Sequence, residues 1–118
     1  MRRQTIQDAR LAEAVKRLVE GLHPRAIILF GSRARGTNRP ESDYDLLVVS
    51  EQLLDYDEVY RPVAGHGLRC DVVPCTVDAW REASLDAGGI LRDALDNGIV
   101  LYGHTSRAMP ASGERRFS

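Results

Sequence analysis

Two aspartates separated by a single residue, Asp43 and Asp45, stand at the head of the apolar run 46–49. Side chains two residues apart on a β-strand point to the same face, so this spacing predicts two neighbouring carboxylates. Such like charges repel each other unless a cation or hydrogen bonds neutralise them. Carboxylate oxygens suit Mg²⁺ or Mn²⁺, which usually complete their coordination with water and substrate phosphates. The pattern therefore predicts a divalent-metal site.

The residues upstream of this pair could hold the phosphates of a substrate. Gly31 lets the backbone approach a ligand closely, and Ser32 supplies a hydroxyl at the start of a short predicted helix whose free amides attract anions. Arg33, Arg35 and Arg39 add positive charge beside them. Helical periodicity places Arg33 and Arg35 on different faces, so one could reach a phosphate while the other contacts solvent or a partner. A surface role is an equally good interpretation of either arginine.

Taken together, these residues resemble a known signature. Gly31 and Ser32, followed by ten residues and then the D-Y-D sequence of 43–45, are similar to the G-S-x10-D-x-D motif of the nucleotidyltransferase superfamily related to DNA polymerase beta. The strings GSRARG and SDYDLLV resemble its small prokaryotic branch, the minimal nucleotidyltransferases that act as antitoxins beside HEPN-domain toxins. An isolated D-x-D pair would be weak evidence, but the whole constellation between two apolar strands is specific. The resemblance covers the chain from about 5 to 102.

A third acid, Asp71, lies in the predicted strand 68–74, LRCDVVP. Alternation places Asp71 on one face of that strand, and Cys70 and Val72 on the other. A carboxylate among β-branched residues is costly without a partner, so Asp71 is the natural third member of a cluster with Asp43 and Asp45. The alternative is an edge-strand aspartate that faces water. The upstream signature favours the catalytic interpretation.

The resemblance implies phosphoryl-type transfer, in which the protein mainly positions the reactants and neutralises charge. In a two-metal scheme, Asp43 and Asp45 would hold the Mg²⁺ ion that binds the triphosphate of ATP and would share a second ion with Asp71. Gly31 and Ser32 would hold the β and γ phosphates. An acceptor hydroxyl would then attack the α phosphorus, pyrophosphate would leave, and Asp71 could accept the acceptor's proton.

The same resemblance implies an antitoxin that transfers AMP from ATP to a tyrosine of a partner HEPN-domain RNase toxin. A second interpretation is a nucleotide-binding antitoxin that neutralises its partner by contact without catalysis; the presence of all three acids favours the enzyme. A third is transfer to a small molecule such as an aminoglycoside. This is less attractive, because 118 residues leave no room for the extra substrate-binding domain of those larger relatives.

Composition limits the other possibilities. Acidic and basic residues nearly balance, 17 against 16, so no global field draws the chain toward nucleic acid or an anionic membrane, and we expect no direct nucleic-acid binding. No apolar run approaches the roughly 20 residues that span a bilayer, which predicts a cytoplasmic protein. Cys70 and Cys75 supply too few ligands for a structural zinc site and are expected to be free thiols.

The elements that must position the acids follow from periodicity and turn signals. A helix is expected to begin at Thr5 as N-cap, and Thr76 is expected to cap a later one. Helices are predicted over 5–20, 32–35, 53–63, 76–85 and 90–96, and strands over 26–30, 44–49, 68–74 and 99–102. Interleaved strands and helices indicate an α/β (α+β) layered domain. The resemblance implies the nucleotidyltransferase fold, with a small mixed sheet of about four strands flanked by helices. We expect this domain over 1–103 and a flexible tail over 104–118.

Overall fold

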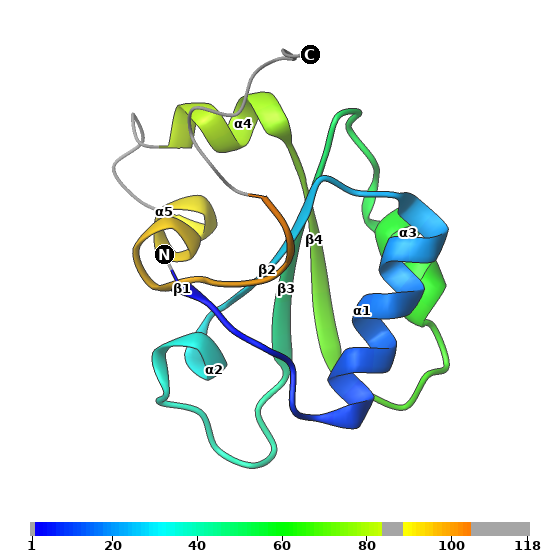
Figure 1. Cartoon of the computed structure of the whole chain (residues 1–118), viewed down its shortest axis with the longest axis vertical. Helices are drawn as coiled ribbons and strands as arrows, with labels where there is room; N and C mark the ends of the chain where they lie inside the picture. Colours follow the sequence, from blue (N-terminus) through cyan, green and yellow to red (C-terminus); the bar gives the residue numbers. More distant parts are fainter. Residues whose placement is uncertain (1, 84–88, 105–118) are drawn as a thin grey trace.

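The computed structural model describes residues 2–83 and 89–104, which form one mixed sheet with helices on both faces (Figure 1). The strands are β1 (Arg2–Arg3), β2 (Ala26–Phe30), β3 (Tyr44–Ser50), β4 (Cys70–Thr76) and β5 (Ile99–Gly103). The helices are α1 (Ala9–Leu22), α2 (Ser32–Arg35), α3 (Tyr56–Tyr60), α4 (Val77–Glu82) and α5 (Ile90–Asn97), and η1 (Arg61–Val63) is a short 3₁₀ turn. The predicted α/β fold with a small mixed sheet is confirmed.

The strand order in the sheet is β1-β5-β2-β3-β4. β3 runs antiparallel to β2 and parallel to β4, while β5 runs antiparallel to β2 and parallel to β1. The parallel pair β3 and β4 needs a crossover, and α3 and η1 lie in that connection. The sheet has one strand more than expected because β1 adds two residues beside β5.

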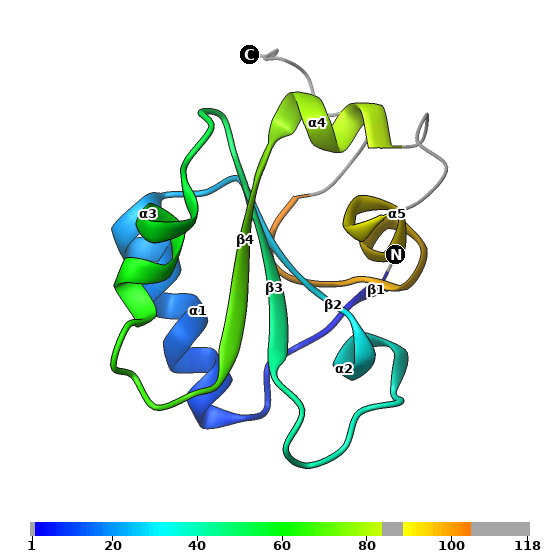
Figure 2. The ribbon, with the colours of Figure 1, turned by 180° about the vertical axis from the view of Figure 1, so that it is seen from behind.

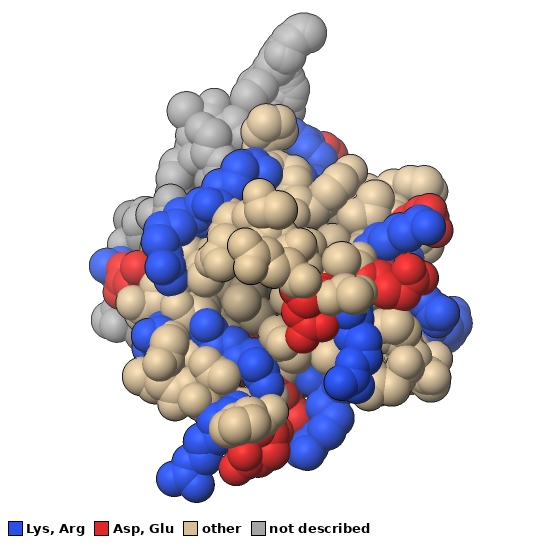
Figure 3. All heavy atoms as spheres, turned by 60° about the horizontal axis from the view of Figure 1, so that its bottom comes forward, with Lys and Arg blue, Asp and Glu red and all other residues tan. Residues whose placement is uncertain are grey.

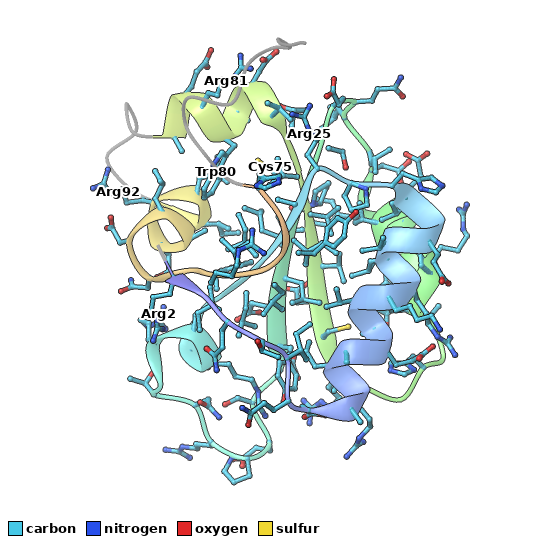
Figure 4. The ribbon with its side chains drawn as sticks, in the orientation of Figure 1. Arg2, Arg25, Cys75, Trp80, Arg81 and Arg92 are labelled. Carbon is cyan, nitrogen blue, oxygen red and sulfur yellow. The ribbon has the colours of Figure 1, made fainter. Side chains whose placement is uncertain are left out.

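Two apolar layers pack on opposite faces of the sheet (Figures 1 and 2). One layer joins α1, α3 and η1 to the sheet through buried residues that include Leu18, Leu46 and Val59. The other joins α4 and α5 to the opposite face, where Cys75 and Trp80 lie between helix and sheet (Figure 4). Within β3, Leu46 belongs to the first layer and Leu47 to the second, so Asp45 shares the α5 side with Leu47.

The first helix begins later than predicted. Asp8, not Thr5, is the N-cap of α1, and its Oδ1 accepts hydrogen bonds from the amides of Arg10 (2.8 Å) and Leu11 (3.4 Å). The preceding residues run along β5, where the amide of Gln4 donates to the carbonyl of Val100. This pairing with a distant strand satisfies backbone groups that an earlier helix start would otherwise use.

Other boundaries also differ from the prediction, most of them by one to three residues. α3 begins at Tyr56, because Asp55 and Glu58 form a reciprocal capping box there. The third long strand, β4, begins at Cys70 instead of residue 68 and continues past Pro74, which an edge strand tolerates. Thr76 caps α4 as predicted, by accepting a hydrogen bond from the amide of residue 79 at 3.0 Å.

Several predictions fall on segments that the structure does not describe. The end of the predicted helix at 84 and 85, and residues 105–118 of the predicted tail, lie outside the described residues. Within the described part, no helix combines the length and the apolar character needed to cross a membrane. On the face of the molecule shown in Figure 3, both basic and acidic side chains are exposed, and the basic ones cover more of the surface.

Candidate active site

Asp45 and Asp71 lie side by side on neighbouring strands. β3 and β4 are parallel, and the register pairs Asp45 directly with Asp71. Asp71 has the same parity along β4 as Val73 and Cys75, which pack with α4 and α5, so both carboxylates are on the α5 side of the sheet. Burial raises the pKa of the Asp45 carboxyl, and the negative charges of Asp71 and Asp43 raise it further.

Asp43 lies just before β3 and takes part in a different contact. Its Oδ1 forms an ion pair with Nε of Arg69 at 3.1 Å; the Arg69 side chain is largely exposed and that of Asp43 about half exposed. A cleft of about 390 Å³ lies beside this pair, with Tyr60 and Cys70 in its wall. Among residues 2–83 and 89–104, no three His, Cys, Asp or Glu side chains are grouped as a metal site. Asp43 is thus near Asp45 but directed to Arg69.

The turn between β2 and α2 brings a glycine against the acid pair. Gly31 has φ of +76°, a conformation that disfavours any residue with a Cβ. A Cβ placed on Gly31 would also overlap Oδ2 of Asp45. The close approach follows from the sheet register, because Phe30 pairs with Asp45 at the end of β2. Gly31 therefore meets two separate requirements, one of backbone conformation and one of space.

Ser32 is the first residue of α2 and is half-buried. Gly31 occupies the N-cap position of this four-residue helix and provides no side-chain cap. The carbonyl of Gly31 accepts hydrogen bonds from the amides of Ala34 and Arg35, both at 3.1 Å. The predicted Gly-Ser turn, short helix and acidic strand are thus brought together, at the end of β2 and the beginning of β3.

Comparison with known protein families matches residues 9–101 to the family described as nucleotidyltransferase domain. The match covers most of the chain. The chain belongs to the nucleotidyltransferase domain family. This finding confirms the resemblance predicted from the Gly-Ser and Asp-Tyr-Asp residues at the level of the family.

Two solved structures are similar to this nucleotidyltransferase domain. One, described as a toxin-antitoxin with AMP-PNP, has 26% sequence identity and a TM-score of 0.56, and the match covers 79% of this chain and 73% of the other. The second is a putative nucleotidyltransferase from Sulfolobus solfataricus, with 18% identity, a TM-score of 0.55, and coverage of 80% and 78%. The second likeness supports the fold alone. No curated protein gives a significant match.

Arg33 of the nucleotidyltransferase domain holds the loop that follows α2. Its guanidinium donates hydrogen bonds to the carbonyls of Ser42 (2.8 and 3.0 Å) and Pro40 (3.0 Å). It also lies 4.0 Å from the centroid of the Tyr44 ring. Tyr44 packs against the α1 side of the sheet, opposite to the acid pair. The contacts of Arg33 are therefore those of a loop-anchoring residue.

Arg35 contacts a carboxylate that the sequence analysis did not single out. Its Nη1 lies 3.0 Å from both oxygens of Asp93 on α5, and Oδ2 of Asp93 also accepts a hydrogen bond from the amide of Gly31 at 3.1 Å. Asn97 donates to Oδ1 at 3.0 Å. Burial by itself would raise the pKa of Asp93, but the hydrogen bonds from Asn97, Arg35 and Gly31 outweigh it and lower that pKa.

Asp93 is the site residue that sequence reasoning missed. In the sequence it is an ordinary polar position on the amphipathic helix α5, and no local pattern links it to Gly31, 62 residues away. Asp93 also interacts electrostatically with the acid pair, because its negative charge helps to raise the pKa of Asp45. The helix packing that brings α5 over the Gly-Ser turn is visible only in three dimensions.

Proposed function

We propose that this nucleotidyltransferase domain transfers AMP from ATP to a tyrosine hydroxyl of a HEPN-domain toxin and thereby acts as its antitoxin. The observation that carries the proposal is the direct pairing of Asp45 with Asp71 beside the Gly31 turn. A relative with 26% identity is described as a toxin-antitoxin with AMP-PNP, an analogue of ATP, which supports both the nucleotide and the class of partner. Because the donor is ATP, we further propose that the chain acts in the cytoplasm.

The acid cluster has the chemistry expected of a divalent-metal site. Burial raises the pKa of Asp45, and the charges of Asp71, Asp43 and Asp93 raise it further, so a bound cation would stabilise the ionised form of this carboxyl. Hard oxygen donors of this kind suit Mg²⁺ or Mn²⁺. We propose that Asp43, Asp45 and Asp71 hold two such ions, with Asp43 leaving its ion pair with Arg69. Bound there, divalent ions would supply charge neutralisation at the phosphates and acidify an acceptor hydroxyl.

The remaining roles belong to the chain's own residues. The amide of Gly31 and the hydroxyl of Ser32 would bind the β and γ phosphates and hold the triphosphate in one orientation. The tyrosine oxygen would attack the α phosphorus in line, forming a phosphodiester bond while the bond to pyrophosphate breaks. Asp71 is exposed on β4, where it could accept the proton from the tyrosine hydroxyl. Arg35 would add positive charge once it is released from Asp93.

A second candidate function is neutralisation of the toxin by contact, without transfer. The observation that favours it is that the carboxylate of Asp43 is paired with Arg69, and that no group of three acids forms a metal site among the described residues. Catalysis requires that this exposed ion pair open, which costs little because surface ion pairs contribute only about 0–1 kcal/mol. The two candidate functions therefore predict different results when one of the three aspartates is replaced: transfer predicts that the toxin is no longer neutralised, and contact inhibition predicts that it still is.

To test this proposal, the chain is incubated with Mg²⁺, ATP labelled at the α phosphate, and a HEPN-domain protein encoded by the neighbouring gene. The label on the HEPN-domain protein is then measured. Asp71→Asn preserves the size of the side chain and should reduce labelling by at least about 100-fold. Asp57→Asn is the matched control, because Asp57 is exposed on α3, on the opposite side of the sheet. This control should label the partner as the wild type does.

Toxin activity measured in the same samples separates the two candidates. If Asp71→Asn abolishes both labelling and neutralisation, transfer is the mechanism. If it abolishes labelling but leaves the toxin neutralised, contact inhibition replaces the proposed function. Absence of label with the wild-type chain, under conditions where the two proteins form a complex, would reject the transferase.

A further inference from the structure

The carboxylate of Asp93 occupies donors that the proposed function assigns to phosphate. Its Oδ2 accepts the hydrogen bond of the Gly31 amide (3.1 Å), and both of its oxygens lie 3.0 Å from Nη1 of Arg35. Asn97 completes the set at 3.0 Å. A carboxylate and a phosphate oxygen are both anionic acceptors, and each prefers charge-assisted donors such as these. Asp93 therefore satisfies the Gly31 amide in the same way that a bound phosphate would.

Without its hydrogen bonds to Gly31, Arg35 and Asn97, the negative charge of Asp93 would be unfavourable at this position. Its charge lies close enough to Asp45 to disfavour ionisation of that residue, in a cluster that already contains Asp43 and Asp71. Like charges in a partly buried site repel each other, so Asp93 is retained there by its donors. A triphosphate accompanied by divalent cations would offer the same donors an anion whose charge is compensated.

The short helix α2 has anchors other than Asp93. On its side nearest β1, Nη2 of Arg2 donates a hydrogen bond to the carbonyl of Ala34 at 2.8 Å (Figure 4). The loop after α2 is held by Arg33, which bonds to the carbonyls of Pro40 and Ser42. The Gly-Ser turn therefore has support from β1 and from its own loop when Asp93 leaves.

We propose that Asp93 is an internal competitor of the nucleotide: it occupies the Gly31 amide and the Arg35 guanidinium until the triphosphate displaces it. The inference rests on the proposed function, since it requires that the phosphates bind at the Gly31 turn. Asp93 thereby sets the concentration of triphosphate needed to occupy the site. Displacement also frees Arg35 to contact the phosphates, so that binding and the release of Asp93 occur together.

The test uses inorganic tripolyphosphate with Mg²⁺ and the full chain, so that neither a partner nor a nucleobase is needed. Calorimetry gives its affinity for the wild type, for Asp93→Asn, and for Asp96→Asn. Asp96→Asn is the matched control, because it removes one negative charge from the same helix. Asp96 pairs with Arg92 instead of Arg35. Asp93→Asn should bind roughly tenfold more tightly than the wild type, and Asp96→Asn should remain within about twofold of it.

Nuclear magnetic resonance of the wild type provides a readout that does not depend on how the variants fold. Tripolyphosphate should shift the amide signal of Gly31 and the carboxyl carbon signal of Asp93 together. Binding that leaves the Asp93 carboxyl signal unchanged, or that is equal or weaker in Asp93→Asn, overturns the competitor role and leaves the proposed function intact. If the folded wild type and Asp93→Asn both fail to bind tripolyphosphate, the phosphate site itself is rejected, and the inference falls with it.

Discussion

At the scale of single residues, Gly31 has two properties that a side chain would disturb. Its φ of +76° places it in the left-handed region, and its α-carbon lies against the Asp45 carboxylate. Gly36, at the other end of α2, has nearly the same φ of +78°, but a Cβ there would meet no atom within 4 Å. The two glycines therefore share the conformational requirement and differ in the space around them.

Gly31→Ala should destabilise the fold more than Gly36→Ala. Alanine in the left-handed region costs about 1–2 kcal/mol at either position, and overlap with Asp45 should add about 1–3 kcal/mol at position 31. Urea unfolding of the two variants and the wild type measures the difference in the free energy of unfolding. Equal destabilisation by the two substitutions would show that the close contact between Gly31 and Asp45 is not present in solution.

Part of the arrangement of the candidate site follows from local signals. Alternation placed Asp71 on the face of its strand opposite to Cys70 and Val72, and the structure pairs Asp71 with Asp45 on the neighbouring strand, beside the turn at Gly31. The order of the strands, which brings these two acids together, did not follow from the sequence pattern. Asp43 and Asp45 were expected to act as a pair, but Asp43 lies before the strand, where its side chain pairs with Arg69. Asp93 could not be predicted, since its role depends on the packing of α5 against a turn far away in the chain.

At the scale of elements, α2 and the loop after it form a unit that Arg33 holds together. The guanidinium bonds to two loop carbonyls and lies over the ring of Tyr44 at the start of β3. Through these contacts Arg33 bridges the loop 36–43 and fixes the distance between the Gly-Ser turn and the acidic strand. They favour the structural interpretation of Arg33 over a contact with phosphate.

Arg33→Lys should lower the free energy of unfolding by about 1–2 kcal/mol, because lysine cannot reproduce the planar fork that reaches Pro40 and Ser42. Its affinity for ATP should change by less than about threefold, since the positive charge is retained and the contacts lie on the Tyr44 side of the sheet. Thermal unfolding and calorimetry measure the two quantities in the same samples. A large loss of ATP affinity without loss of stability would instead assign Arg33 to the phosphates.

Elements that are delimited by strong local signals have the predicted boundaries, and elements whose boundaries depend on distant partners do not. β2 and α2 have the predicted boundaries, because an apolar run, a Gly-Ser turn and Gly36 delimit them locally. The start of α1 was wrong because the N-terminal residues pair with β5, almost 100 positions later. Such long-range pairing leaves no trace in a window of ten or fifteen residues.

At the scale of the whole molecule, the acid pair lies close to an edge of the sheet. β4, which carries Asp71, is the last strand in the described sheet, and Asp71 is exposed there. An open site of this kind can admit an acceptor as large as another protein, as the proposed function requires. The acidic and basic residues of the chain nearly balance, 17 against 16, so the net charge provides no strong field of one sign, and recognition of the partner must depend on local contacts.

The most direct test of the central claim is the affinity for ATP in the presence of Mg²⁺, measured by calorimetry on the wild type and on Asp45→Asn. The wild type should bind ATP in a Mg²⁺-dependent manner, and Asp45→Asn should bind it at least about tenfold more weakly, because a neutral amide cannot replace a carboxylate in holding the cation. Asp57→Asn should bind as the wild type does. Equal affinity of the wild type and a folded Asp45→Asn would contradict a metal-nucleotide site built on this acid pair.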